Sequence, residues 1–117
     1  MDKSLDSLQQ LMRIRTFEFL ARLVEANIPV MIINTLRTGA EQNLNIKNGA
    51  SWTPNSKHLI GNAIDICPYS IYQEKGDDKL QWDASDPLWT KIGTIGESCG
   101  LKWGGRWIQK DMGHFEI

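Results

Sequence analysis

The chain is short, slightly acidic and poor in cysteine. Its 117 residues suit one domain with a single core, and a net charge of −1 gives no basic field that would hold nucleic acid or an anionic membrane surface. No apolar run approaches the roughly 18 residues of a membrane span, and the N-terminus lacks the layout of a signal peptide, so we expect synthesis in the cytoplasm. We expect the two cysteines, Cys67 and Cys99, to be free thiols.

A helix and a strand are the first predicted elements. Between residues 4 and 27 apolar side chains recur at spacings of three, four and seven, which predicts an amphipathic helix. Residues 28–35 are β-branched or apolar nearly throughout and predict a strand buried on much of both faces. Arg37 follows this strand directly, in a place where scaffolds commonly present functional side chains. On position alone, a solvated surface arginine remains the simpler interpretation.

The next stretch brings an imidazole and a carboxylate together. Residues 39–47 are predicted to form a short helix, and the polar loop that follows contains Trp52, which could line a cleft or cover the core. His58 precedes a strand predicted from alternation, which carries Asp65 on a rigid element. Gly61 lies between them, and its freedom at positive φ lets the backbone fold back. The sequence therefore predicts that His58 and Asp65 lie side by side.

A long loop and a second helix follow. Residues 68–85 show no sustained period and predict a long surface loop that could act as a lid. Its acidic residues lack the Asp-x-Asp-x-Asp-Gly order of a calcium loop, so we predict no cation site there. Asp86 as N-cap and Pro87 at the first helical position begin a helix, and Gly100 ends it.

The chain closes with a strand over residues 101–103, a tight turn at the paired glycines that follow, and a last strand over residues 114–117. Trp103 and Trp107 could each belong to the core or to the wall of a cleft, and we place Trp103 inward. These elements predict an α+β domain in which helices pack on a small, mainly antiparallel sheet.

Two histidines and a carboxylate are candidate metal ligands. Catalytic zinc takes about three nitrogen or carboxylate ligands and keeps a position open for water. His58, Asp65 and His114 meet that count and use both histidines of the chain. Lone histidines are usually structural, so the residues alone leave that alternative open. Asp111, three residues before His114, is by itself equally a turn residue ahead of a strand.

The order of these residues resembles a known family. Ser-x-His-x-x-Gly-x-Ala-x-Asp over residues 56–65, followed by Asp-x-x-His-x-Glu over residues 111–116, is similar to the zinc D-Ala-D-Ala carboxypeptidase and L-alanyl-D-glutamate endopeptidase family. The resemblance includes Arg37 with Gln42, and runs from about residue 28 to the end of the chain. The Trp-Gly-Gly-x-Trp element and the Asp-x-x-His spacing look most like the endopeptidase branch, which includes many phage endolysins.

The resemblance implies a fold and a metal site. The fold would be that of the hedgehog and DD-peptidase group, with zinc held by His58, Asp65 and His114. In the family the position of Asp111 holds the catalytic carboxylate, which takes a proton from water and passes it to the leaving amine. Glu116 could orient a ligand histidine or could be a solvated end residue.

Further roles follow from the same resemblance. Arg37 would lie near the zinc and hold a substrate carboxylate or a developing oxyanion, and Gln42 would support it. Ser56 and Trp103 would contact substrate, although Ser56 alone reads equally well as a turn hydroxyl. Many relatives carry proline where this chain has Gly113, which predicts a less rigid turn before the last ligand.

We therefore expect residues 1–117 to form a single catalytic peptidase domain with no separate cell-wall-binding domain. Its partner would be a peptidoglycan stem peptide, in which it would hydrolyse the L-Ala–D-Glu bond. We expect the protein to be a monomer that binds no nucleic acid and enters no membrane. As an endolysin it would be made in the host cytoplasm and act on the wall after release. One alternative is a D-Ala-D-Ala carboxypeptidase. The other is a non-catalytic zinc module that binds wall peptide or a protein, and the presence of Asp111 and Arg37 argues against this second alternative.

Overall fold

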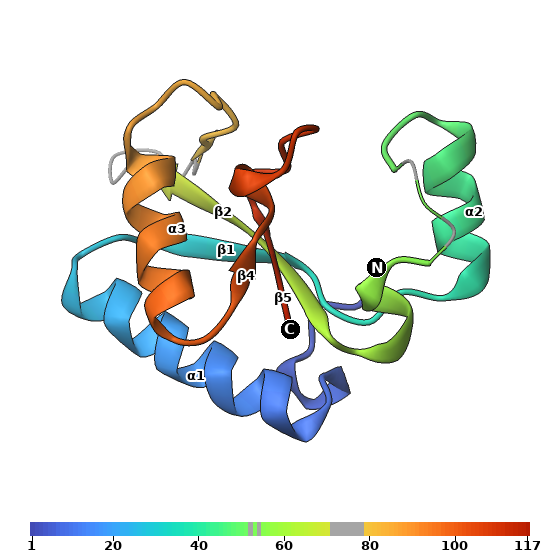
Figure 1. The fold of residues 1–117 in the computed structure, drawn as a ribbon, viewed down its shortest axis with the longest axis horizontal. Helices are drawn as coiled ribbons and strands as arrows, with labels where there is room; N and C mark the ends of the chain where they lie inside the picture. Colours follow the sequence, from blue (N-terminus) through green and yellow to red (C-terminus); the bar gives the residue numbers. More distant parts are fainter. Residues whose placement is uncertain (52, 54, 71–78) are drawn as a thin grey trace.

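The computed structural model describes residues 1–51, 53, 55–70 and 79–117. It confirms the α+β class (Figure 1). The α-helices are α1 (Gln10–Glu25), α2 (Gly39–Lys47) and α3 (Leu88–Ser98). The strands are β1 (Val30–Asn34), β2 (Ala63–Ser70), β3 (Lys79–Leu80), β4 (Lys102–Trp103) and β5 (His114–Glu116). Short 3-10 helices occupy η1 (Leu5–Ser7), η2 (Lys57–Ile60) and η3 (Gly104–Arg106).

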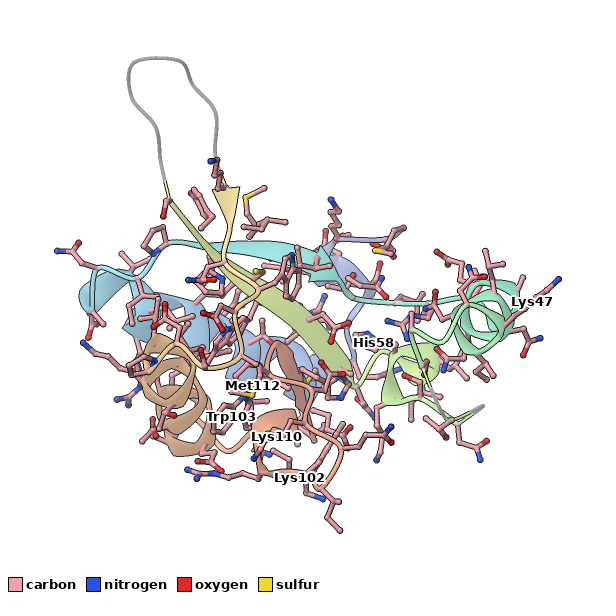
Figure 2. The ribbon with its side chains drawn as sticks, turned by 90° about the horizontal axis from the view of Figure 1, so that it is seen from above. Lys47, His58, Lys102, Trp103, Lys110 and Met112 are labelled. Carbon is pink, nitrogen blue, oxygen red and sulfur yellow. The ribbon has the colours of Figure 1, made fainter. Side chains whose placement is uncertain are left out.

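The sheet is built around β2. The strand order is β1-β2-β5-β4, with β3 paired to the far end of β2, and every pair is antiparallel. Figures 1 and 2 show α1 and α3 together on one face of the sheet, while α2 stands apart beside η2. Because β2 pairs on both sides, residues near its start can meet side chains from β1 and from β5.

The core fixes the position of β5. Phe115 is fully buried, and its ring lies 4.6 Å from the ring of Phe19 on α1. Gly96 on α3 makes room for it, because a Cβ there would lie 2.5 Å from the Phe115 ring. Ile64 and Ile66 of β2 are also fully buried, as the alternation predicted. The neighbours of these core residues, Asp65 and His114, are therefore held by a packed sheet.

Two elements differ from the sequence prediction. The helix expected over residues 4–27 is broken into η1 and α1, because the backbone N–H of Gln9 donates to the carbonyl of Gly61 (2.9 Å) rather than within a helix. The strand β1 is not buried on much of both faces: Met31 is 41% exposed. The prediction was wrong because α1 and α3 cover only one face of the sheet.

The predicted boundaries of the other helices hold closely. Helix α2 spans the predicted residues and begins with a reciprocal capping box between Thr38 and Glu41. Helix α3 begins one residue later than predicted, with Pro87 at the N-cap, although Asp86 does accept the N–H of Leu88 (2.9 Å). Gly100 follows the helix with a φ of +84°. Both cysteines are buried free thiols, as predicted. Among the described residues, no helix has the length and apolar character needed to cross a bilayer.

The long loop is shorter than expected, because β2 continues to Ser70 and pairs with β3. Residues 71–78, which hold the middle of the predicted lid and its acidic cluster, lie outside the described residues, as does Trp52.

Candidate active site and metal centre

Three strands bring a row of polar residues together. In the sheet register Asp65 on β2 lies opposite Asn34 on β1 and opposite His114 on β5. The register of β1 shifts between Ile32 and Asn34, and this irregularity places Asn34 rather than Ile33 opposite Asp65. Strand pairing therefore fixes the positions of two of the three predicted ligands, Asp65 and His114. It also places the buried amide of Asn34 beside them, which the sequence prediction missed. The signal for it was a polar residue at the end of an apolar strand.

His58 approaches the same point from outside the sheet. It lies in η2, where the hydroxyl of Ser56 accepts the His58 backbone N–H (3.2 Å) and Gly61 ends the turn with a φ of +73°. The ring is 1% exposed, and its Nδ1 lies 2.7 Å from the carbonyl oxygen of Thr35. Its Nε2 lies 3.1 Å from Oδ2 of Asp65. Figure 2 shows His58 where η2 meets the start of β2.

His114 faces the other oxygen of the same carboxylate. Its Nδ1 lies 3.0 Å from Oδ1 of Asp65, and its Nε2 lies 2.8 Å from Oε1 of Glu116. One ligand atom from each of His58, Asp65 and His114 falls within 4.8 Å of the others. The site thus joins two imidazoles across one carboxylate, in a position where a metal ion can sit between them.

The protonation pattern fits a metal ion. Because Nδ1–H of His58 donates to the Thr35 carbonyl, Nε2 carries a lone pair. Among the described residues this buried Nε2 has no hydrogen-bond partner, although Oδ2 of Asp65 lies 3.1 Å away. Two acceptors facing each other at that distance repel unless a cation lies between them. Likewise Nε2–H of His114 donates to Glu116, which leaves the Nδ1 lone pair directed at Asp65.

The electrostatics of the site favour a bound positive charge. Burial alone would raise the pKa of Asp65, but its close contacts with the imidazoles of His114 and His58 outweigh burial and hold this pKa well below its usual range. Burial would lower the pKa of His114, but its bonds to Asp65 and Glu116 raise it to about 9. In the metal-free protein a proton on His114 supplies the positive charge, and a divalent ion would replace that proton.

Arg37 is locked into the site. Its side chain is only 10% exposed, which rules out a solvated surface arginine. Nε donates to Oδ1 of Asn34 (2.9 Å), Nη1 to Oε1 of Gln42 (2.7 Å), and Nη2 points at Oδ2 of Asp65 at 3.4 Å. Gln42 is itself held, since its amide N–H group donates to the hydroxyl of Ser51 (2.8 Å). The guanidinium is therefore fixed beside Asp65 with N–H groups left over.

Asp111 lies in a turn and also lines the cleft. Its backbone makes a turn, donating to the Gly104 carbonyl (3.1 Å) and accepting the N–H of His114 (3.2 Å), while the residue lines the cleft beside His114. Burial, and next the charge of Asp65, raise the pKa of its carboxyl group. A carboxylate with a raised pKa is better suited to take a proton from water.

The turn that carries Asp111 lies close against β2 at Gly113. The carbonyl of Gly113 accepts the N–H of Ile66 (2.9 Å), which ties the turn to β2. A Cβ on Gly113 would overlap the carbonyl oxygen of Ile66. The close approach of the two backbones requires glycine here, and the less rigid turn stays a prediction.

A cleft of about 290 Å³ opens over the site. Its lining includes Ser56 and Trp107, whose ring centroid lies 5.0 Å from that of His114. Trp103 instead lies in the core, 4% exposed, with Nε1–H donating to the Met112 carbonyl (2.8 Å). Both residues are labelled in Figure 2. The inward placement of Trp103 is confirmed, but that burial does not support the expected substrate contact, and Trp107 has the position for it. The described flanks of the predicted lid, residues 68–70 and 79–85, do not line the cleft.

The described part of the chain thus places a candidate His-Asp-His metal site on an antiparallel α+β scaffold. The family model described as D-alanyl-D-alanine carboxypeptidase, of peptidase family M15, matches residues 49–117. The chain belongs to this family.

Comparisons with known proteins agree with this assignment. Over 81 residues the chain is 38% identical to the L-alanyl-D-glutamate peptidase of Listeria phage A118, covering 68% of this chain and 27% of that protein. Over 94 residues it is 31% identical to the L-alanyl-D-glutamate peptidase of Escherichia phage T5, covering 74% of this chain and 64% of that protein. The chain thus spans less than two thirds of either relative.

A solved structure is similar along nearly the whole chain. The crystal structure of the L-Ala D-Glu endopeptidase ChiX of Serratia marcescens matches with a TM-score of 0.73 and 25% identity. The match covers 97% of this chain and 82% of that one. The N-terminal half, which the family model does not match, therefore shares this fold as well.

Proposed function

We propose that this protein is a zinc endopeptidase that hydrolyses peptidoglycan stem peptides between L-Ala and D-Glu. The observation that carries the proposal is the convergence of His58, Asp65 and His114, with the Nε2 atom of His58 buried and without a hydrogen-bond partner. The choice of bond is supported by the two phage relatives and by ChiX, which are named for this activity.

The residues of the site divide the work among them. His58, Asp65 and His114 would hold the zinc ion, which supplies a Lewis acid that activates water and polarises the scissile carbonyl. Asp111 takes the proton of the attacking water and passes it to the leaving amine. The free N–H groups of Arg37 stabilise the charge that develops on the carbonyl oxygen.

The cleft offers two cations to an anionic group of a peptide, beside the carboxylates of Asp65, Asp111 and Glu116. Arg37 and Lys57 are the cationic side chains among its lining residues, and Trp107 forms part of its wall. In a stem peptide the α-carboxylate of D-Glu is free and adjacent to the L-Ala bond, so a cation beside the metal can recognise it. Ser56 is the remaining candidate contact, although its hydroxyl already serves the turn before His58.

We also propose that residues 1–117 act as one catalytic domain and as a monomer, without nucleic acid or membrane lipid as a partner. A phage-borne enzyme of this kind would be made in the host cytoplasm and reach the wall after release. Removal of terminal D-Ala is the second candidate activity, because the family description carries that name.

The bond can be identified from the products. Purified muropeptides are incubated with the zinc-loaded protein, analysed by mass spectrometry and labelled with dinitrophenyl at new amino ends. We expect new N-terminal D-Glu, with L-Ala left on the lactyl-muramic acid. Free D-Ala without new D-Glu ends would make the protein a carboxypeptidase. No new ends of any kind would favour a zinc module that only binds wall peptide.

The role of Asp111 can be separated from that of a ligand. Asp111→Asn keeps the shape of the side chain but cannot take a proton, so we expect turnover to fall by roughly 10²-fold or more with zinc affinity unchanged. Asp65→Asn is the matched control and should weaken zinc binding itself. Normal turnover by Asp111→Asn would move the base elsewhere, with Glu116 next.

A further inference from the structure

The backbone carbonyl of Asp2 accepts hydrogen bonds from two adjacent residues at the end of β1, and each of these residues bonds to a side chain of the site. It accepts the side-chain amide of Asn34 (2.9 Å) and the backbone N–H of Thr35 (2.8 Å). The Asn34 amide in turn accepts Nε–H of Arg37 (2.9 Å), and the Thr35 carbonyl accepts Nδ1–H of His58 (2.7 Å). The carbonyl oxygen of Asp2 is therefore linked by hydrogen bonds to the Arg37 guanidinium through Asn34, and to the candidate ligand His58 through Thr35.

The orientation of the Asn34 amide is fully determined. Its Nδ2 group donates to two carbonyls, those of Asp2 (2.9 Å) and Leu36 (3.3 Å), so its oxygen must face Arg37. The side chain is 1% exposed, which removes water as a substitute partner. Losing the Asp2 carbonyl from its place would leave a buried amide proton unpaired and free the Asn34 side chain to turn.

The carboxylate of Asp2 fixes where that carbonyl lies. It accepts the backbone N–H of Ser4 (2.7 Å), the hydroxyl of Ser7 (2.6 Å) and the hydroxyl of Thr35 (3.3 Å). These bonds connect η1 to the end of β1 through one side chain. The hydrogen bond from Ser7, followed by that from Ser4, lowers the pKa of Asp2, so the group is ionised at neutral pH.

The same N-terminal segment supports the turn after His58. The N–H of Gln9 donates to the Gly61 carbonyl (2.9 Å), and a Cβ on Gly61 would lie 2.8 Å from the Ser7 carbonyl oxygen. In Figure 1 the N-terminus lies beside η2 and α2, and the Met1 amine is 3.9 Å from Glu41 of α2. Residues 2–9 thus contact the end of the turn that presents His58 and the end of β1, where Thr35 accepts the Nδ1–H of His58.

We propose, on the basis of the zinc site proposed above, that Asp2 is a positioning residue for the metal centre. Its carboxylate holds its own carbonyl in place, and this carbonyl fixes Arg37 through Asn34 and His58 through Thr35. Asp2 lies far outside residues 49–117, which the family model matches. Groups that orient metal ligands from outside the coordination sphere commonly change metal affinity about 10–100-fold when removed.

The test measures metal binding rather than turnover. Zinc affinity is measured by competition with a chromophoric chelator, and the visible spectrum of the Co²⁺-loaded protein reports ligand geometry. Asp2→Ala should weaken zinc binding about 10-fold and alter the Co²⁺ spectrum. Asp2→Asn should restore both, because an amide can still accept the Ser4 N–H. Asp6→Ala is the matched control in the same segment, since its carboxylate is 94% exposed and makes only a 3.9 Å contact with Arg13.

Ser7→Ala provides a milder variant if Asp2→Ala does not fold, and should weaken zinc binding in the same direction by a smaller factor. Wild-type zinc affinity and Co²⁺ spectra in the folded Asp2 and Ser7 variants would overturn the inference and leave the zinc site intact. A lowered melting temperature with unchanged affinity would likewise reduce Asp2 to a structural role and overturn it. Failure of the wild-type protein to bind one metal ion would overturn the proposed function itself.

Discussion

The two halves of the site are held in place by different means. Asp65 and His114 face each other because β2 and β5 pair over a packed core. His58 and Arg37 reach the same point from segments without a strand partner, and individual polar contacts to Thr35 and Asn34 hold them. The comparison teaches that the first pair depends on sheet register and the second on single hydrogen bonds. The positions of Asp65 and His114 should therefore be lost only when the fold is lost or the side chain itself is replaced. The positions of His58 and Arg37 should change gradually as individual hydrogen bonds are removed.

Removing a strand-held ligand should have the largest effect. His114→Ala deletes one of the three candidate ligands. It also removes the imidazole that contacts both the Asp65 and the Glu116 carboxylates. We expect zinc affinity to fall by more than about 10²-fold and hydrolysis to disappear. Equilibrium dialysis with zinc analysis measures the first, and release of muropeptide ends measures the second. His58→Ala should match it, and full activity in either variant would refute the metal assignment.

Arg37 tests the half that depends on single bonds. Arg37→Lys keeps the charge, but an ammonium cannot bond Asn34 and Gln42 in the fixed planar geometry of the guanidinium. We expect kcat to fall by about 10²-fold while zinc affinity stays within a few-fold of wild type. Arg22→Lys is the control, because Arg22 is an exposed partner of Glu18. An unchanged kcat would show that Arg37 only supports the loop.

Glu116 tests whether strand register alone is enough to orient a ligand. It accepts Nε2–H of His114 (2.8 Å) from the same strand. In Glu116→Ala the ring keeps its place in β5 but loses the acceptor that fixes its tautomer, so we expect zinc affinity to fall about 10-fold. Chelator competition measures this loss. Glu97→Ala, on an exposed pair with Arg106, is a suitable control. Unchanged affinity in Glu116→Ala would mean that pairing with β2 suffices.

A separate expected effect concerns the stability of the metal-free protein, through proton linkage. The pKa of His114 is raised from 6.5 to about 9, so the folded state binds this proton more tightly than the unfolded state. The resulting stability is fully present below about pH 6.5 and is lost as the pH rises through about 9; it is on the order of 3 kcal/mol at most. Urea unfolding of metal-free protein between these values measures it. Metal-free His114→Ala should lack this slope, and an equal slope in that variant would assign it to another group.

The strand-held half of the site was visible in the sequence. Alternation placed Ile64 and Ile66 in the core and so directed Asp65 to a fixed position, and Gly61 indicated the fold-back that brings His58 beside it. Both signals are local, because they depend on neighbours within a few residues. The α+β class followed from similar local patterns, whereas the full set of candidate metal ligands was predicted from the family resemblance, because His114 lies 49 residues beyond Asp65.

The contacts of the other half could not be predicted, because they join segments distant in sequence. The register shift that sets Asn34 opposite Asp65 depends on how β1 and β2 pair, and no local pattern encodes it. The bond from Gln9 to Gly61 breaks the first helix at a point that periodicity alone would continue. Trp103 and Trp107 flank η3 with similar sequence surroundings, and only the close fit of Trp103 against Gly93 and Gly105 decides which one is buried.

Gly113 has a consequence for engineering this protein from its relatives. Replacing a residue by the one most common in a family is a standard route to higher stability, and proline in a compatible turn adds about 0.4–1 kcal/mol. At position 113 an added Cβ would overlap the Ile66 carbonyl, on the strand that carries Asp65. The substitution that a family average recommends would therefore push β2 away from β5 and separate Asp65 from His114. Consensus design of this enzyme should leave that glycine unchanged.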